Sequence, residues 1–255
     1  MSQATLRFYA ELNDFLPPAR RQRDWRMSFD APAPVRHLIE ICGVPHTEIE
    51  LIMRDGESID LETRVGDGER IAVYPMFEAF DVRSVLRVRP NALREIRFLA
   101  DAHLGALARR LRMMGFDTLW HNDLGDVELA AVAGREHRIL LSRDRQLLMR
   151  RAVTHGCYLR PGSTRSQLAY LVERLQLCAE IRPFSRCIAC NSSLVAVAPS
   201  AVRDRVPPAV RRSLHDYWLC EGCGRVYWKG SHWQAMRRQI AEICPGAADP
   251  VHPRG

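Results

Sequence analysis

Two short apolar segments of this 255-residue chain each end in an aspartate. Residues 96–100 lead into Asp101, residues 138–143 lead into Asp144, and a third acid, Asp126, opens the helical pattern between them. In α/β proteins the functional side chains gather where the strands of the sheet end, so we expect these carboxylates at one sheet edge. Carboxylate oxygens suit Mg²⁺ or Mn²⁺, and a cation bound in this way activates water for attack on a phosphodiester.

Each aspartate taken alone also has a simpler interpretation. An aspartate at a helix start commonly accepts backbone N–H hydrogen bonds and acts as an N-cap. The coincidence of Asp101, Asp126 and Asp144 at one edge favours the hypothesis of a metal site over that of three separate caps. Asp123 and Glu128 are weaker candidates for a fourth acid.

Arginines are concentrated beside the first and last of these acids. Arg109, Arg110 and Arg112 are predicted to lie on the polar face of the helix that follows Asp101. Guanidinium groups make bidentate contacts with phosphate, whereas the alternative is an ordinary solvated helix face. The candidates for nucleic-acid binding are Arg109, Arg112, Arg143 and Arg145.

Four of the eight cysteines form two close pairs, Cys187/Cys190 and Cys220/Cys223. Two such pairs offer four thiolates, which predicts a closed tetrahedral site for structural zinc, with a redox role as the alternative. The other cysteines are expected to be buried small apolar residues or inert thiols, because a reducing cytosol disfavours disulfides. They are Cys42, Cys157, Cys178 and Cys244.

An aromatic and basic stretch follows the second cysteine pair, with Tyr227, Trp228 and Lys229 close to Trp233. Such side chains can stack on nucleic-acid bases. The alternative is that they fill the small core of a zinc-stabilised segment.

The composition is that of a globular protein, with 47% hydrophobic residues and a net charge of +7. Residues 1–85 have 10 basic and 15 acidic side chains, whereas residues 86–255 have 27 basic and 15 acidic ones. No apolar run approaches the ~20 residues that span a bilayer, and no leader-like basic and apolar segment begins the chain. We therefore expect a cytoplasmic protein without a membrane partner.

The hydrophobic pattern divides the chain into a mixed first part and a regularly alternating second part. Residues 1–85 show strands, one helix over residues 35–42 and further strands, which predicts a small α+β domain of the β-grasp type. Strand and helix patterns alternate over residues 96–182, which predicts a parallel sheet. The remaining segments are a linker at 86–95, a zinc ribbon at 183–240 and a disordered tail at 241–255.

The second part resembles a known family. The residues that carry this resemblance are Phe98-Leu99-Ala100-Asp101, Leu107-Ala108-Arg109-Arg110-Leu111-Arg112-Met113-Met114-Gly115, Ser142-Arg143-Asp144-Arg145, the paired cysteines and Tyr227-Trp228-Lys229-Gly230-Ser231-His232-Trp233. They resemble the Mut-seven C-terminal ribonuclease domain family, a PIN-like nuclease fold with a zinc ribbon. Residues 1–85 are similar to the ubiquitin-like domain often found ahead of it, through Phe8-Tyr9-Ala10-Glu11-Leu12, Gly43-Val44-Pro45-His46-Thr47-Glu48 and Val73-Tyr74-Pro75.

The resemblance implies an α/β PIN-like sheet with helices on both faces and a metal-dependent ribonuclease activity. Asp101, Asp126 and Asp144 match the acidic positions and would hold Mg²⁺ or Mn²⁺, while zinc would be structural. RNA is the implied substrate, and the ubiquitin-like domain is a possible site for a protein partner. The alternative is a non-catalytic RNA-binding or ribosome-associated adaptor.

Overall fold

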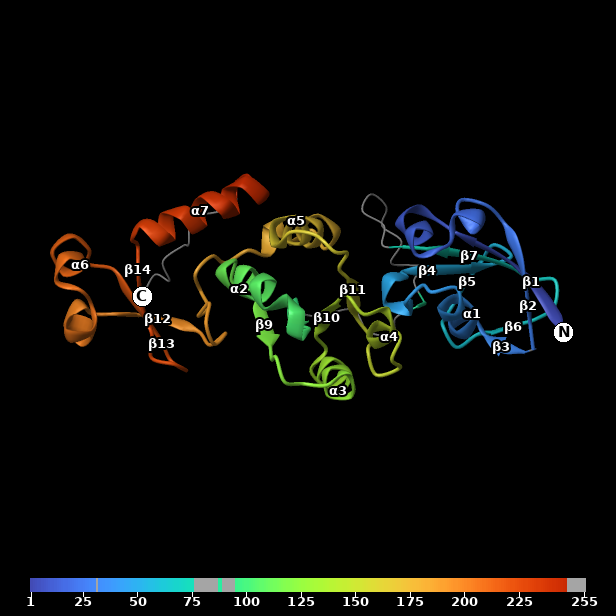
Figure 1. The fold of residues 1–255 in the computed structure, drawn as a ribbon, viewed down its shortest axis with the longest axis horizontal. Helices are drawn as coiled ribbons and strands as arrows, with labels where there is room; N and C mark the ends of the chain where they lie inside the picture. Colours follow the sequence, from blue (N-terminus) through green and yellow to red (C-terminus); the bar gives the residue numbers. More distant parts are fainter. Residues whose placement is uncertain (31, 76–86, 89–94, 247–255) are drawn as a thin grey trace. The chain divides into compact units, whose positions relative to one another are not determined.

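The computed structural model describes residues 1–30, 32–75, 87–88 and 95–246 (Figure 1). The predicted linker lies largely outside the described residues. Packing separates the chain into two compact units, of which the first holds Met1–Glu95 with Leu124–Leu159 and the second Ile96–Asp123 with Arg160–Gly255. In the described part of the chain, no helix has both the length and the hydropathy of a bilayer-spanning segment.

The amino-terminal domain is the predicted α+β fold, a mixed sheet in the order β2-β1-β7-β4-β5. Its strands are β1 (Ser2–Phe8), β2 (Trp25–Phe29), β4 (Leu51–Arg54), β5 (Glu57–Ile59) and β7 (Arg70–Tyr74). The central pair β1 and β7 is parallel and the other pairs are antiparallel. A short second ladder joins β3 (Ala33–Pro34) to β6 (Arg64–Val65).

Helix α1 (Val35–Ile41) of this domain buries one apolar face. Val35, Leu38 and Ile39 are fully buried in the core of the domain. The helix ends at Ile41, and the chain turns away at Gly43, whose φ of +86° only glycine adopts readily.

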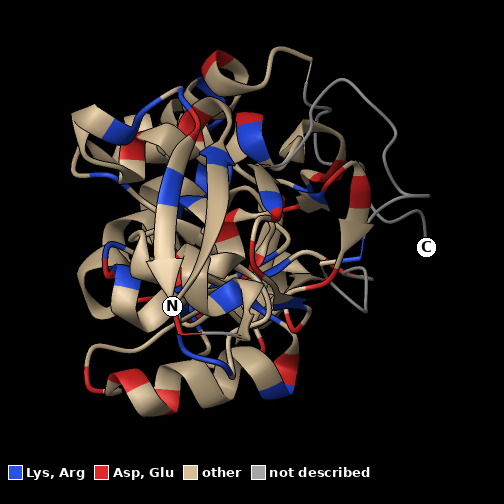
Figure 2. Cartoon of the chain, turned by 90° about the vertical axis from the view of Figure 1, so that its right-hand side faces the viewer, with Lys and Arg blue, Asp and Glu red and all other residues tan. Residues whose placement is uncertain are grey.

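Charges of both signs are interspersed over the elements that face the viewer in Figure 2. In the first domain, Asp24 accepts hydrogen bonds from Arg7 and Arg70 at 3.1 to 3.3 Å. The hydrogen bond from Arg70 holds the pKa of Asp24 below its usual value. Local pairing therefore neutralises part of the excess acidity of this domain.

The first unit also contains a parallel strand pair from the second half of the sequence. These strands are β10 (Ile139–Ser142) and β11 (Gly156–Tyr158). They are accompanied by the helices α3 (Asp126–Glu136) and α4 (Arg145–Leu148), with Leu129 and Leu148 buried. The predicted alternation of strands and helices is confirmed here.

The second unit begins with a similar parallel pair, β8 (Arg97–Ala100) and β9 (Asp117–Trp120). Helices α2 (Gly105–Met113) and α5 (Thr164–Arg174) accompany it. Helix α2 buries an apolar stripe through Leu107 and Leu111, which Leu104 extends just before the helix begins. The strand order β11-β10-β8-β9 makes one four-stranded parallel sheet, as the sequence predicts.

The segment with the paired cysteines forms a three-stranded antiparallel sheet in the order β12-β13-β14. Its elements are β12 (Leu194–Val197), α6 (Pro208–Ser213), β13 (Tyr217–Cys220), β14 (Val226–Trp228) and α7 (Ser231–Ile243). Helix α7 lies partly where the sequence predicted a disordered tail from residue 241. Its apolar positions Trp233, Met236 and Ile240 follow helical spacing, which is the signal that could have revealed it.

The expectation that Cys178 and Cys244 are inert thiols is wrong. They form a disulfide with Cα atoms 5.6 Å apart, which fastens the end of α7 to the turn after α5. The two cysteines are 66 residues apart in the sequence, and α7 brings them together. Cys42 and Cys157 are buried free thiols, as predicted.

Candidate functional site

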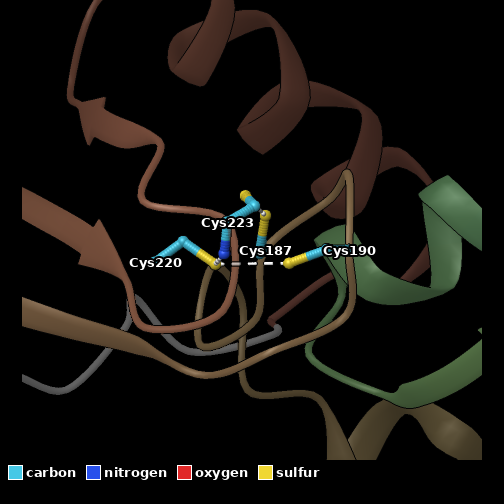
Figure 3. Close-up of side chains that lie close together, drawn as sticks. All are labelled: Cys187, Cys190, Cys220 and Cys223. Carbon is cyan, nitrogen blue, oxygen red and sulfur yellow. Dashed lines mark hydrogen bonds between the residues drawn. The ribbon is translucent and has the colours of Figure 1, made fainter.

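The four paired cysteines converge on one point of the ribbon (Figure 3). The Sγ atoms are 3.6 Å apart for Cys187 and Cys223 and 3.3 Å apart for Cys190 and Cys220, and all four lie within 4.8 Å of one another. A tetrahedral zinc ion with Zn–S bonds of ~2.3 Å would place its sulfur ligands ~3.8 Å apart. The donor set therefore fits zinc, as the sequence predicts.

Each cysteine pair is bent into its turn by the residue that follows it. Asn191 and Gly224 have left-handed backbones, with φ of +75° and +72°. Their N–H groups donate to the carbonyl oxygens of Cys187 and Cys220, both at 2.9 Å. Glycine and asparagine are the residues that adopt this conformation at least cost, so the local sequence itself specifies the two turns.

Ser192 lies against both pairs. A side chain at Gly222 would collide with the Ser192 hydroxyl, so only glycine fits there. Burial opposes ionisation of the Cys190 thiol, but hydrogen bonds with Ser192, Cys220 and Cys187 outweigh it and lower the pKa of Cys190 to about 6. Burial raises the pKa of Cys220 to about 12, so the metal itself must displace the proton from this thiol.

The prediction that Arg112 lies on the polar face of its helix, available to nucleic acid, is wrong. Its side chain is buried, with 4% of the residue surface exposed. The guanidinium donates to the carbonyl oxygens of Thr118 at 2.8 Å and Ala189 at 2.9 Å, and so joins β9 to the first cysteine turn. Arg112 follows Leu104 and Ala108 at four-residue spacing, which is the signal that places it on the buried stripe.

Replacing Arg112 by leucine should lower the free energy of unfolding by about 2–4 kcal/mol, because buried carbonyl groups lose a charged donor. Urea denaturation measures this change. Arg109→Leu on the exposed side of the same helix is the matched control and should stay within ~0.5 kcal/mol of the parent. Equal stability of the two variants would show that Arg112 does not hold the cysteine turn in place.

Two of the predicted acidic residues lie at the ends of strands, as the sequence predicts. Asp101 follows β8 and its Oδ1 accepts the N–H of Ala102 at 2.6 Å. Asp144 follows β10 and its Oδ1 accepts the N–H of Gln146 at 2.7 Å. Both carboxylates are therefore N-caps, and the same hydrogen bonds fix the orientation in which each carboxylate could bind a cation.

The third acid, Asp126, is the exposed first residue of α3, with its Oδ2 3.8 Å from a guanidinium nitrogen of Arg150. Glu128 accepts the N–H of Gly125 at 3.1 Å and so caps the same helix start. Asp123 is exposed in the preceding loop. Among the described residues, the cysteines alone form a group of three or more potential ligands whose donor atoms lie within 4.8 Å of one another.

The remaining candidate arginines differ in their surroundings. Arg109 and Arg143 are exposed. The guanidinium of Arg145 lies over the rings of Phe15 at 4.9 Å and Tyr158 at 5.3 Å, within the first unit. Because Arg145 is engaged with the amino-terminal domain, Arg109 and Arg143 are the better candidates for RNA contacts.

A buried acid that the sequence analysis did not single out fastens the amino-terminal domain to strand β11. Glu48 has 1% of its surface exposed, and its Oε1 accepts the N–H of Tyr158 at 2.6 Å. Nearby, Nε2 of His46 lies 2.8 Å from the carbonyl oxygen of Val153. Because β11 is an edge strand, this carboxylate takes the place of a neighbouring strand at that amide.

Glu48→Ala should lower the free energy of unfolding of the full chain by about 1–3 kcal/mol, because the Tyr158 amide loses its buried acceptor. Hydrogen exchange of that amide should accelerate. Glu48→Gln keeps an acceptor oxygen and should retain most of the protection, whereas Glu57→Ala at an exposed site should change neither quantity. Unchanged exchange at Tyr158 in Glu48→Ala would contradict this role.

Comparison with known proteins gives two family matches. The family model described as Mut7-C RNAse domain matches residues 96–240, which is more than half of the chain. The family model described as Mut7-C ubiquitin matches residues 1–81. A search of curated proteins found no match.

Proposed function

We propose that this chain, which belongs to the Mut7-C RNAse domain family, hydrolyses RNA phosphodiester bonds with a divalent cation held by carboxylates. The family match supports a ribonuclease in general terms, and the cation is our inference. Asp101 and Asp144 would be the principal ligands. Asp126 would be a third ligand or would orient the attacking water.

The proposal rests above all on how the structure supports the carboxylates of Asp101 and Asp144. Each follows a strand of the parallel sheet, and each has one oxygen fixed by a backbone N–H. Metal-ligating carboxylates are typically held by such outer hydrogen bonds. Hard oxygen donors of this kind select Mg²⁺ or Mn²⁺ rather than the softer metals that thiolates bind.

We assign the cation, the aspartates and the exposed arginines separate roles in the reaction. When bound, Mg²⁺ or Mn²⁺ would lower the pKa of a coordinated water and neutralise charge on the scissile phosphate. Asp101, Asp126 and Asp144 would fix the position and orientation of the reacting groups. Exposed Arg109 and Arg143 would bind neighbouring phosphates without reading sequence.

The test is cleavage of a labelled single-stranded RNA by the zinc-loaded full chain, with Mn²⁺ or Mg²⁺ added or withheld. We expect cleavage only with the added cation, and products with a 5′-phosphate and a 3′-hydroxyl that poly(A) polymerase can extend. Equal cleavage without the cation, or ends that carry a 2′,3′-cyclic phosphate, would refute a cation-activated water.

A further inference from the structure

The zinc ribbon contains an aromatic pocket that the proposed catalytic site does not use. Its volume is about 440 Å³, within the ~300–1,000 Å³ typical of small-ligand sites. The residues that define the aromatic pocket are Phe184, Trp218, Tyr227, Trp228, Lys229 and Trp233. All six are only half-buried, so part of each surface is available to a ligand, although Trp228 also packs against the small core on the other face of the sheet.

The strand register sets two of the rings side by side. Trp218 on β13 is directly opposite Ala196 on β12 and Tyr227 on β14, so all three project from one face of the sheet. The preceding residue, Tyr217, points to the other face and packs in a small core with Val202. Ala196 and Trp218 both line the aromatic pocket.

The four-cysteine site holds one ring of the aromatic pocket in place. The hydroxyl of Tyr227 lies 3.0 Å from Sγ of Cys187, which fixes the tilt of the ring. Hydrogen bonds to metal ligands of this kind hold both partners in place. The position of Tyr227 in the aromatic pocket therefore depends on the four-cysteine site.

The rim of the pocket is held in a strained conformation. Phe184 has a φ of +58°, which is rare for a bulky residue. Its N–H donates to the carbonyl oxygen of Met113 at 3.1 Å, and its ring lies 5.4 Å from that of Trp233. Strain of this kind persists where the surroundings over-determine it, and it concentrates at ligand sites.

Cationic groups surround the rings. Nζ of Lys229 lies 5.5 Å from the centre of the Trp218 ring and 5.7 Å from that of Trp233, and the guanidinium carbon of Arg237 lies 4.9 Å from Trp233. Arg186 lines the same pocket. Residues 181–255 hold 11 basic and 5 acidic side chains, so the surroundings favour an anionic ligand.

We propose that the aromatic pocket binds an unstacked base of single-stranded RNA, with Lys229 and Arg237 holding its flanking phosphates. A base offers a flat π face to Trp218, and its phosphates are complementary to the cations at the rim. A neutral apolar peptide would engage the rings alone, whereas single-stranded RNA also brings phosphates to Lys229, whose exposed pair with Asp216 at 3.4 Å a phosphate can replace. This inference names the substrate class for the proposed ribonuclease and rests on that function.

The experiment measures binding to the zinc-loaded full chain by fluorescence anisotropy, with Mn²⁺ and Mg²⁺ omitted. The two probes are a labelled ten-nucleotide oligoadenylate and a ribose-phosphate chain of the same length without bases. Trp218→Ala should weaken binding of the oligoadenylate by about 5- to 150-fold and leave the abasic chain within about twofold. Trp25→Ala is the matched control, because Trp25 is half-buried beneath Arg20 in the amino-terminal domain.

The cations are tested separately from the rings. Lys229→Gln should weaken both probes and reduce the slope of log K against log salt by about 0.7, because one phosphate contact on a single strand is lost. Arg26→Gln, at an exposed position in the amino-terminal domain, should change neither quantity. If Lys229→Gln leaves the slope unchanged, the phosphate contact is wrong.

Zinc content and circular dichroism show whether Trp218→Ala keeps its fold, and Trp218→Phe retains a stacking surface and should recover most of the affinity. Equal affinities of Trp218→Ala and Trp25→Ala for oligoadenylate would overturn the proposal, as would equal weakening of both probes by Trp218→Ala. A preference for a neutral aromatic peptide over oligoadenylate would also overturn it and assign the pocket to a protein ligand. If wild type binds through Trp218 yet cleaves no RNA with Mn²⁺, only the ribonuclease proposal fails.

Discussion

Asp101→Asn and Asp144→Asn are each expected to lower the rate of RNA cleavage by at least about 100-fold, because each removes a charged ligand whose cation contributes several kcal/mol. Asparagine is as good an N-cap as aspartate. Its side-chain oxygen can still accept the N–H of Ala102 or Gln146. The substitution therefore distinguishes an N-cap from a cation ligand, because asparagine keeps the capping hydrogen bond and loses the charge that binds the cation.

The measurement is kcat/KM over a series of Mn²⁺ concentrations, together with the melting temperature. Both variants should melt within a few degrees of the parent and need more Mn²⁺ for any residual activity. Asp30→Asn, at an exposed site after β2, is the control and should cleave like the parent. Full activity of Asp101→Asn and Asp144→Asn would leave both residues with a capping role only.

Cys220→Ser is expected to abolish zinc binding and to unfold the ribbon that contains β12, β13 and β14. Cys220 is buried, and all four sulfur atoms are needed to close the tetrahedral site. Structural zinc contributes an apparent ~10–16 kcal/mol to folding, which exceeds what so small a sheet can supply by itself. Zinc content should fall from one ion per chain to none, and the emission of Trp218 and Trp228 should shift to the red.

The four-cysteine site also predicts how zinc binding depends on pH. Zinc binds thiolates, so acidification favours release of the ion, whereas higher pH favours its retention. With its pKa lowered to about 6, Cys190 keeps its thiolate over most of the neutral range, whereas Cys220, with a pKa raised to about 12, needs the metal to ionise. Cys42→Ser replaces a buried thiol elsewhere and should retain the ion. Full zinc content in Cys220→Ser would contradict the four-thiolate site.

Local patterns in the sequence were sufficient to predict the main strands and helices of residues 96–182 and the four-cysteine cluster. The stripe of Leu104, Leu107 and Leu111 is set by helical periodicity, and each cysteine turn by a Cys-x-x-Cys spacing. Such signals lie within a few residues of one another. They can therefore be recognised before the fold is known.

The misassigned residues depend on partners far away in the chain. In the sequence Arg112 has the pattern of a surface arginine, because its partner Ala189 lies 77 residues further along the chain. Glu48 likewise has the pattern of a surface acid, because the amide of Tyr158 that it accepts lies far away in the sequence. Burial of a charged side chain is decided by such distant hydrogen bonds. Likewise, Cys178 and Cys244 become a disulfide only because α7 brings them together.

The most direct test of the central claim is the anomalous scattering of manganese in crystals of the full chain grown with Mn²⁺. We predict a peak bound by carboxylate oxygens of Asp101 and Asp144, with Asp126 as a direct ligand or joined through a water. The Asp101→Asn crystal should lack this peak while it keeps the zinc peak at the four cysteines. Absence of manganese from all three aspartates, in crystals of a chain that still cleaves RNA, would contradict the account.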